Sequence, residues 1–180
     1  MSNFAFVPQT FGDVASAAIK AESYIKGDPR SACFHTRFAL ERIVDWLYRH
    51  DTSLQMPYGQ NLGALLHEPS FQNLLPEAVF QKARVIQKVG NQAVHSARNI
   101  SDVDALQTVK ELHHICYWLT RTYAPNASRE GAAWKDERVP TPIDGAKIVP
   151  RKDLEALEEQ LAEQQQHALK QQQEHDALNA

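Results

Sequence analysis

The sequence predicts an all-α protein: an antiparallel four-helix bundle over residues 1–124, an extended connector over 125–150, and a helix over 151–180 that starts a coiled coil. Three observations support this fold class. Helix start and stop signals recur along the bundle region, where strand signals are nearly absent. Pro and Gly residues then interrupt the connector, and after it the composition shifts to Glu, Gln, Ala and Leu. Four helices with short connections favour antiparallel packing.

The first two helices are marked by their ends. The first is expected from about Asp13 to Lys26, where Gly27 closes it. Asp28 is a favourable N-cap and Pro29 a favourable first helical residue, so this pair predicts the start of the second helix. Apolar residues recur at helical spacing in the second helix and predict a broad core-facing stripe, made of Cys33, Ala39, Leu40, Ile43, Val44, Trp46 and Leu47.

The rest of the bundle is predicted from turn and cap residues. The MPYG stretch at 56–59 predicts a turn, and Asn61 can cap the short helical segment LGALLHE. Pro76 opens the next helix, EAVFQKARVIQKVGNQAVH. Ser101 and Asp104 resemble a capping box, with Asp in place of the usual Glu or Gln, and start the last helix of the bundle.

The C-terminal helix leaves two interpretations open. Leu154, Leu157 and Leu161 fit the start of a heptad repeat, but the seam then continues with Gln164, Ala168 and Gln171. The helix either starts a coiled coil or is a solvated helix that frays. It stops at HDALNA without a cap, which is typical of a fragment of a longer protein.

Composition indicates a cytoplasmic protein with an ordinary core. Of its 180 residues 43% are hydrophobic, and no stretch predicts a secretion signal or a membrane span. Cys33 and Cys116 lie among apolar neighbours and are expected to be buried thiols rather than a disulfide. No metal site is predicted, because no Cys and His spacing fits zinc.

Charge is distributed unevenly along the chain. The formal net charge is −3, but residues 151–180 hold three basic and seven acidic side chains and so carry −4. The first 150 residues therefore carry a net charge of +1. This nearly neutral net charge does not indicate nucleic-acid binding.

The stretch KVGNQAVHSARN places chemistry-bearing residues inside a predicted helix. Gly90 costs about 1 kcal/mol relative to Ala in a helix interior, and it would permit a close approach of backbone or ligand. Asn91 lies four residues before His95 and Lys88 seven before it, all on one helical face. They could form a polar notch for a phosphate or a carboxylate. The usual alternative is a structural or surface histidine.

The stretch RFALE in the second helix places Arg37 and Glu41 one turn apart. Two interpretations are open for this pair. An exposed pair at this spacing contributes about 0.2–0.5 kcal/mol. Alternatively, the apolar neighbours Phe38 and Leu40 would leave the pair partly buried, where it would connect two helices of the bundle.

RFALE, followed about fifty residues later by GNQAVH, resembles the all-helical N-terminal domain of many type I restriction enzyme R subunits. That domain belongs to the HEPN superfamily of helical bundles, and in related chains an extended segment and a Gln/Glu-rich coiled coil follow it. The resemblance implies a HEPN-like bundle whose parent protein translocates and cleaves DNA with ATP and Mg²⁺ in phage defence. It implies no cofactor for this chain, which lacks a GxxxxGK[ST] phosphate loop.

The catalytic motif of HEPN ribonucleases is incomplete here. That motif reads Arg, then Asn or another polar residue, then His four positions later. Asn91 and His95 match, but Gly90 takes the arginine position, and Lys88 lies two residues away and points elsewhere on the helix. Arg84 and Arg98 are off the motif. The fixed cation that would stabilise charge on a phosphorane is therefore missing.

Three hypotheses of function follow. The leading one is a non-catalytic docking or regulatory module that contacts the methyltransferase complex or the rest of the R subunit, and reaches DNA only through that complex. The second is a HEPN ribonuclease, for example a toxin, that works through His95. The third is a homodimeric interaction module whose contact patch is aromatic, with Tyr117, Trp118 and Trp134 as candidates.

Overall fold

The computed structural model describes residues 1–128, 130–142 and 148–178. Side chains of the C-terminal helix are described at 151–164, 166–167 and 170–171. No strand occurs among these residues, and the predicted all-α fold is confirmed. The chain divides into two compact units, Met1–Ile148 and Val149–Ala180.

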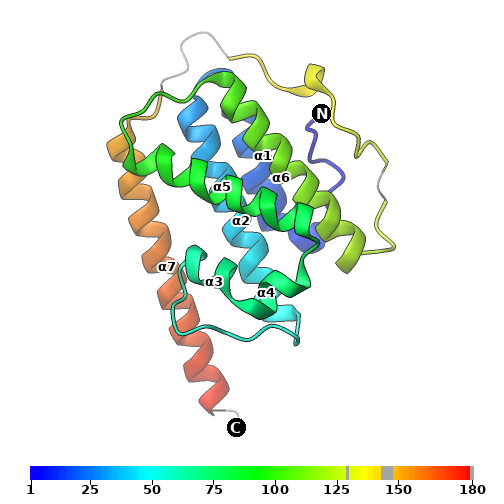
Figure 1. Cartoon of the computed structure of the whole chain (residues 1–180), viewed down its shortest axis with the longest axis vertical. Helices are drawn as coiled ribbons and strands as arrows, with labels where there is room; N and C mark the ends of the chain where they lie inside the picture. The colour runs from blue at the N-terminus through cyan, green and yellow to red at the C-terminus, as the bar shows by residue number, and fades with distance from the viewer. Residues whose placement is uncertain (129, 143–147, 179–180) are drawn as a thin grey trace. The chain divides into compact units, whose positions relative to one another are not determined.

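Four long helices build the first unit, and α5 crosses in front of α2 in Figure 1. Two short helices lie between α2 and α5 in the chain, and two 3₁₀ turns flank the bundle. The long helices are α1 (Gly12–Tyr24), α2 (Pro29–His50), α5 (Glu77–His95) and α6 (Asp102–Tyr123). The shorter elements are η1 (Gln9–Phe11), α3 (Leu62–His67), α4 (Pro69–Leu74) and η2 (Asp136–Arg138).

The predicted caps start three of these helices. The side chains of Asp28 and Asn61 each accept a hydrogen bond from the backbone N–H three residues further on, at 3.1 and 3.0 Å. Ser101 and Asp104 form the predicted capping box, in which each side chain bonds the other residue's backbone N–H. Each such cap contributes about 1 kcal/mol to its helix.

Helix α2 is central to the core, because α1, α5 and α6 all pack against it. Its predicted apolar stripe is buried as expected, except that Trp46 is half-buried and packs edge-on against Phe11. Burying a Leu or Ile side chain fully contributes about 1.5–3 kcal/mol, so this helix stabilises the unit most. The buried members are Cys33, Ala39, Leu40, Ile43, Val44 and Leu47.

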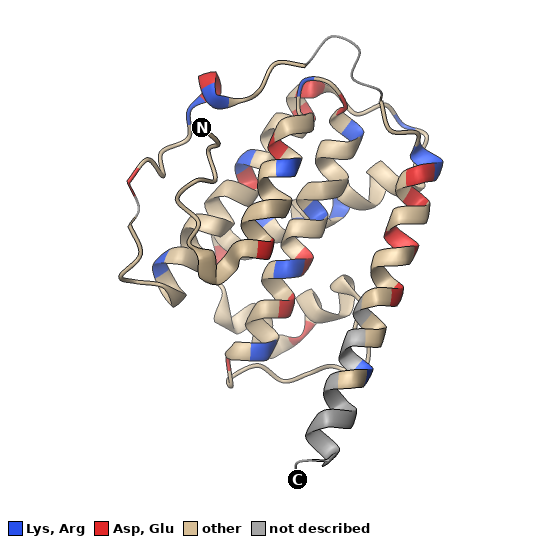
Figure 2. Ribbon diagram, turned by 180° about the vertical axis from the view of Figure 1, so that it is seen from behind, with Lys and Arg blue, Asp and Glu red and all other residues tan. Residues whose placement is uncertain are grey.

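The segment after α6 packs against the bundle of the first unit. Apart from η2 it is irregular in its described parts, and Ala132 and Val139 are buried. The first compact unit accordingly continues to Ile148, past the boundary expected at residue 124. Residues 129 and 143–147 of the predicted connector lie outside the described residues. Figure 2 shows basic and acidic residues mixed along the helices of this unit.

The second unit is one helix, α7 (Arg151–Leu178). Arg151 and Glu155 form an ion pair one turn apart in it, with 3.4 Å between Nε and Oε1. The start of a coiled coil stays a prediction, and its seam position Ala168 has no described side chain. Among the described residues, no helix is both long and apolar enough to span a membrane.

Candidate functional site

Gly90 lies buried where α5 crosses α2. A Cβ atom at this position would lie 2.4 Å from the Cβ of Arg37 and 2.7 Å from its Cδ. Both distances are far inside van der Waals contact, which for carbon atoms is about 3.5–4.0 Å. Only glycine therefore fits between the helices at this separation, and its low helix propensity is offset by the packing it allows.

Arg37 and Glu41 form an ion pair on the α2 side of this crossing. Their Nε and Oε1 atoms are 3.1 Å apart, and the two side chains are 16% and 21% exposed. The aliphatic part of Arg37 rests on Gly90. The two stretches that carry the family resemblance, RFALE and GNQAVH, therefore meet in one helix–helix contact.

Arg30 holds the C-terminal end of α5 from the same face of α2. Its Nη1 donates to the carbonyl oxygens of Ala93 and Ser96 at 2.5 and 2.9 Å, and its Nη2 donates to that of Arg98 at 2.7 Å. Ala93 lies in the last turn of α5, Ser96 is its C-cap and Arg98 follows it, and a cation is favoured at such a helix end, where carbonyls lack intrahelical partners. This role of Arg30 was not predicted from the sequence, although Arg30 lies seven residues before Arg37 and so on the same helical face.

The other motif residues face outward. Lys88, Asn91 and His95 are exposed on α5, and so is Arg84, whose Nη1 lies 2.8 Å from the ring Nε2 of His67. The structure thus separates the predicted site residues into two groups. Gly90, Arg37 and Glu41 form the helix contact, while the polar notch residues lie on the surface.

The N-terminal segment closes one side of the bundle, a feature that the sequence did not reveal. Glu22 is 1% exposed and accepts hydrogen bonds from the backbone N–H and side-chain amide of Asn3, at 3.0 and 2.8 Å, and one from Ser2 Oγ. Asn3 also binds Lys135 reciprocally, donating to its carbonyl at 3.0 Å and accepting from its N–H at 2.8 Å. We call these contacts the N-terminal clasp.

His113 lies beside the clasp in a box of aromatic rings. The rings of Phe4, Phe6 and Trp134 lie with centroids 5.6, 5.1 and 5.3 Å from its imidazole. Burial and, to a smaller extent, the nearby His114 lower the pKa of His113 to about 4, against the raising effect of backbone groups of Asn3 and Ala132. The imidazole is therefore neutral near pH 7 and acts as a packing group.

A small hollow of about 240 Å³ opens between the start of α1 and the C-terminal half of α2. Arg42 and Asp45 line it and pair at 3.2 Å, and burial raises the pKa of the Asp45 carboxyl. Arg49 and Asp13 add one more charge of each sign. This mixed lining favours neither an anion nor a cation.

Other candidate groups are placed as follows. Cys33 and Cys116 are free and buried, and burial raises the pKa of the Cys33 thiol to about 12. Within the described ranges, no group of three or more His, Cys, Asp and Glu side chains could hold a metal ion. Of the aromatic candidates for an interface, Tyr117 is exposed, whereas Trp118 and Trp134 are half-buried.

The bundle and the α2–α5 crossing define an all-α domain in which Gly90 serves the packing of two helices. Residues 20–161 match the family model described as "Domain of unknown function (DUF4145)", and the chain belongs to this family. The match begins within α1 and ends within α7. Among curated proteins and solved structures, no significant match is found.

Proposed function

We propose that this chain is a non-catalytic docking module, the N-terminal domain of a type I restriction-modification R subunit. The packing of Gly90 supports the proposal most directly. A Cβ at this position would overlap the Cβ of Arg37, so the motif arginine has no room unless α2 and α5 move apart. Residue 90 therefore serves helix packing. ATP, Mg²⁺ and DNA would be bound by the rest of the parent protein and its methyltransferase partner.

The chemistry of RNA cleavage supports the same conclusion. A developing phosphorane carries extra negative charge, which HEPN ribonucleases stabilise with their arginine. Removing one fixed donor from such a site costs about 10²–10³-fold in rate. His95 without that cation therefore lacks the group that stabilises the transition state.

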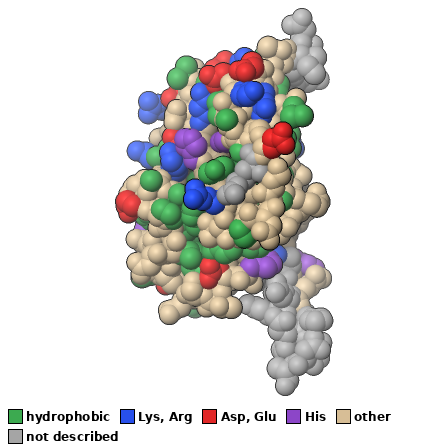
Figure 3. Space-filling view, turned by 90° about the vertical axis from the view of Figure 1, so that its right-hand side faces the viewer, with side chains coloured by type: hydrophobic (Ala, Val, Ile, Leu, Met, Phe, Trp, Pro, Cys, Tyr) green, Lys and Arg blue, Asp and Glu red, His purple; other side chains and the backbone are tan. Residues whose placement is uncertain are grey.

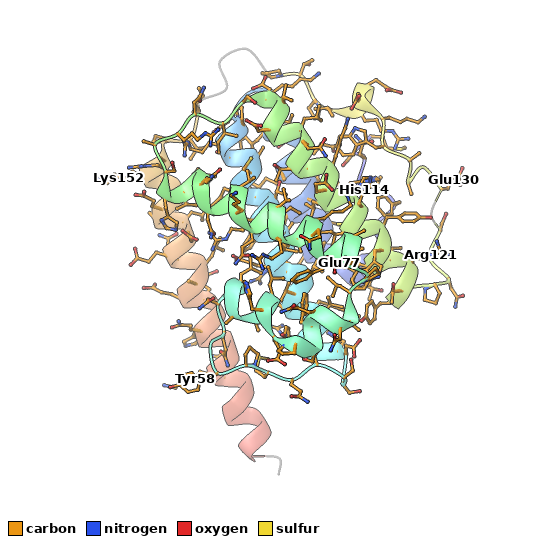
Figure 4. The ribbon with its side chains drawn as sticks, viewed as in Figure 1. Tyr58, Glu77, His114, Arg121, Glu130 and Lys152 are labelled. Atoms are coloured by element: carbon orange, nitrogen blue, oxygen red, sulfur yellow. The ribbon has the colours of Figure 1, made fainter. Side chains whose placement is uncertain are left out.

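Exposed apolar side chains are the second kind of support for docking. The loop between α2 and α3 exposes Met56 and Tyr58, and Tyr58 is as exposed as in an isolated peptide, at 107%. Figure 4 shows the Tyr58 side chain projecting outward from its loop. Tyrosine is enriched among the residues that dominate binding energy at protein interfaces.

Deletion of residues 1–180 from the parent tests the proposal. The truncated R subunit should keep its ATPase activity but assemble poorly with the methyltransferase, as measured by co-purification and analytical ultracentrifugation. Loss of ATPase turnover in a well-folded truncation would contradict the docking role, and so would unchanged assembly.

A ribonuclease is the second candidate function, favoured only by the exposure of Lys88, Asn91 and His95 on one side of α5. It predicts that the purified chain cleaves RNA and that His95→Ala abolishes the cleavage. His67→Ala, at another exposed histidine, is the matched control. Absence of cleavage across structured and single-stranded RNAs would end this alternative.

A further inference from the structure

Four exposed side chains follow one line along α5. Arg84, Lys88, Asn91 and His95 are spaced by four, three and four residues, and we call them the α5 stripe. This spacing keeps side chains on one face of a helix. At a rise of about 1.5 Å per residue, the stripe is about 16 Å long.

The stripe is locally basic in a body that is nearly neutral. No Asp or Glu occurs between Arg84 and His95, and Arg98 follows soon after. The acidic residue of α5 is Glu77, labelled at the start of the helix in Figure 4, two turns before Arg84. From the neighbouring α3, His67 contacts Arg84 as a further nitrogen group.

The helix that carries the stripe is held firmly. Gly90 packs against Arg37 on the inner side, and Arg30 binds the carbonyls at the C-terminal end. The outward side chains therefore project from a fixed axis, and less backbone freedom is lost when a partner binds. Such preorganisation increases affinity without further contacts.

We propose that the α5 stripe binds an acidic α-helical segment of a partner protein. The inference rests on the proposed docking function and names its partner chemistry. A partner helix has the same rise per residue, so carboxylates spaced by four and three residues along one face match Arg84 and Lys88 in register. Asn91 adds an amide nitrogen that can bind a further carboxylate oxygen.

A nucleic acid fits the stripe less well. Specific nucleic-acid binding usually uses about 6–10 phosphate contacts, whereas the stripe offers two fixed cations in single file. On the side of the first unit that faces the viewer in Figure 3, acidic, basic and hydrophobic side chains are mixed. Paired helices form salt bridges between charged residues that lie in rows beside their contact face, and the two cations of the stripe form such a row.

Binding of a designed peptide to the full 180-residue chain tests this inference. The probe is a labelled, stapled helix with Glu at positions i, i+4, i+7 and i+11, and its control has the same composition with Glu spread around the helix. Fluorescence anisotropy should show at least about tenfold weaker binding after Arg84→Glu with Lys88→Glu. The matched control, Lys20→Glu with Arg121→Glu, makes the same charge change on exposed positions of α1 and α6 and should bind like the unchanged chain.

A compensating peptide sharpens the test. A peptide with Lys in place of the four Glu residues should bind the Arg84→Glu, Lys88→Glu chain better than the unchanged chain, while circular dichroism confirms that both are folded. Equal binding of the ordered and shuffled acidic peptides, equal loss in both charge-reversed chains, or tighter binding of duplex DNA or RNA would overturn the inference. If the charge-reversed parent still assembles with the methyltransferase, the binding role of the α5 stripe is refuted, but the proposed docking function is not. Failure of the docking function would instead show as unchanged assembly of the R subunit that lacks residues 1–180.

Discussion

Replacing Gly90 by Ala tests the central contact of the site. The added Cβ would lie 2.4 Å from the Cβ of Arg37, an atom that moves only with the α2 backbone. Helix propensity alone would make this change stabilising by about 1 kcal/mol. Overpacking costs about 1–3 kcal/mol, and the rigid partner atom places this case at the upper end.

The net expectation is a loss of about 2 kcal/mol in the free energy of unfolding, and a Tm lower by about 4–8 °C. Urea and thermal unfolding followed by circular dichroism measure both quantities. Gly12→Ala at the start of α1 is the control, because its Cβ would meet only the flexible end of the Gln9 side chain, at 3.1 Å. That variant should be close to neutral.

A double-mutant cycle shows whether Arg37 is the cause. In an Arg37→Gly chain the opposing Cβ is gone, so Gly90→Ala should become neutral or stabilising, with a coupling energy of about 2 kcal/mol. If Gly90→Ala is as stable as the unchanged chain, or if its cost persists beside Arg37→Gly, the contact does not explain the glycine.

Three further predictions follow from the described contacts. The pKa of His113 is about 4 in the folded chain, below its ordinary value of 6.5, so its contribution to stability should fall by up to about 3 kcal/mol as pH falls from about 6.5 to 4; His113→Phe should remove this contribution in urea titrations. Arg30→Ala leaves carbonyls at the end of α5 without a donor and should cost about 1–2 kcal/mol, with faster hydrogen exchange at residues 93–98. Asn3→Ala removes the side-chain hydrogen bond to buried Glu22 and both bonds to Lys135, and limited proteolysis should then cut the 132–139 segment sooner than in an Ala5→Ser control.

Local signals in the sequence predicted the helices well. Caps such as Asp28, Asn61 and the Ser101–Asp104 box act within three residues, so their effect can be read without knowing the fold. The apolar stripe of α2 was likewise readable, because burial of one helix face leaves a periodic pattern.

The site itself depended on contacts between distant residues. The sequence marked Gly90 as a place of close approach but could not name Arg37 as the group that approaches. Nor could it show that Asn3 binds Lys135, since neither residue belongs to a periodic pattern and 132 positions separate them. The pairing in both contacts is set by the tertiary fold.

The N-terminal clasp also affects the order in which the protein is completed during synthesis. Asn3 is made before all four long helices of the bundle, but its partner Lys135 is made only after them. Until then Asn3 lacks its hydrogen bonds to Lys135, and the box around His113 lacks Trp134. A nascent chain that pauses at Tyr123 would hold its helices with this side open, a state in which chaperones could still bind the apolar N-terminal segment.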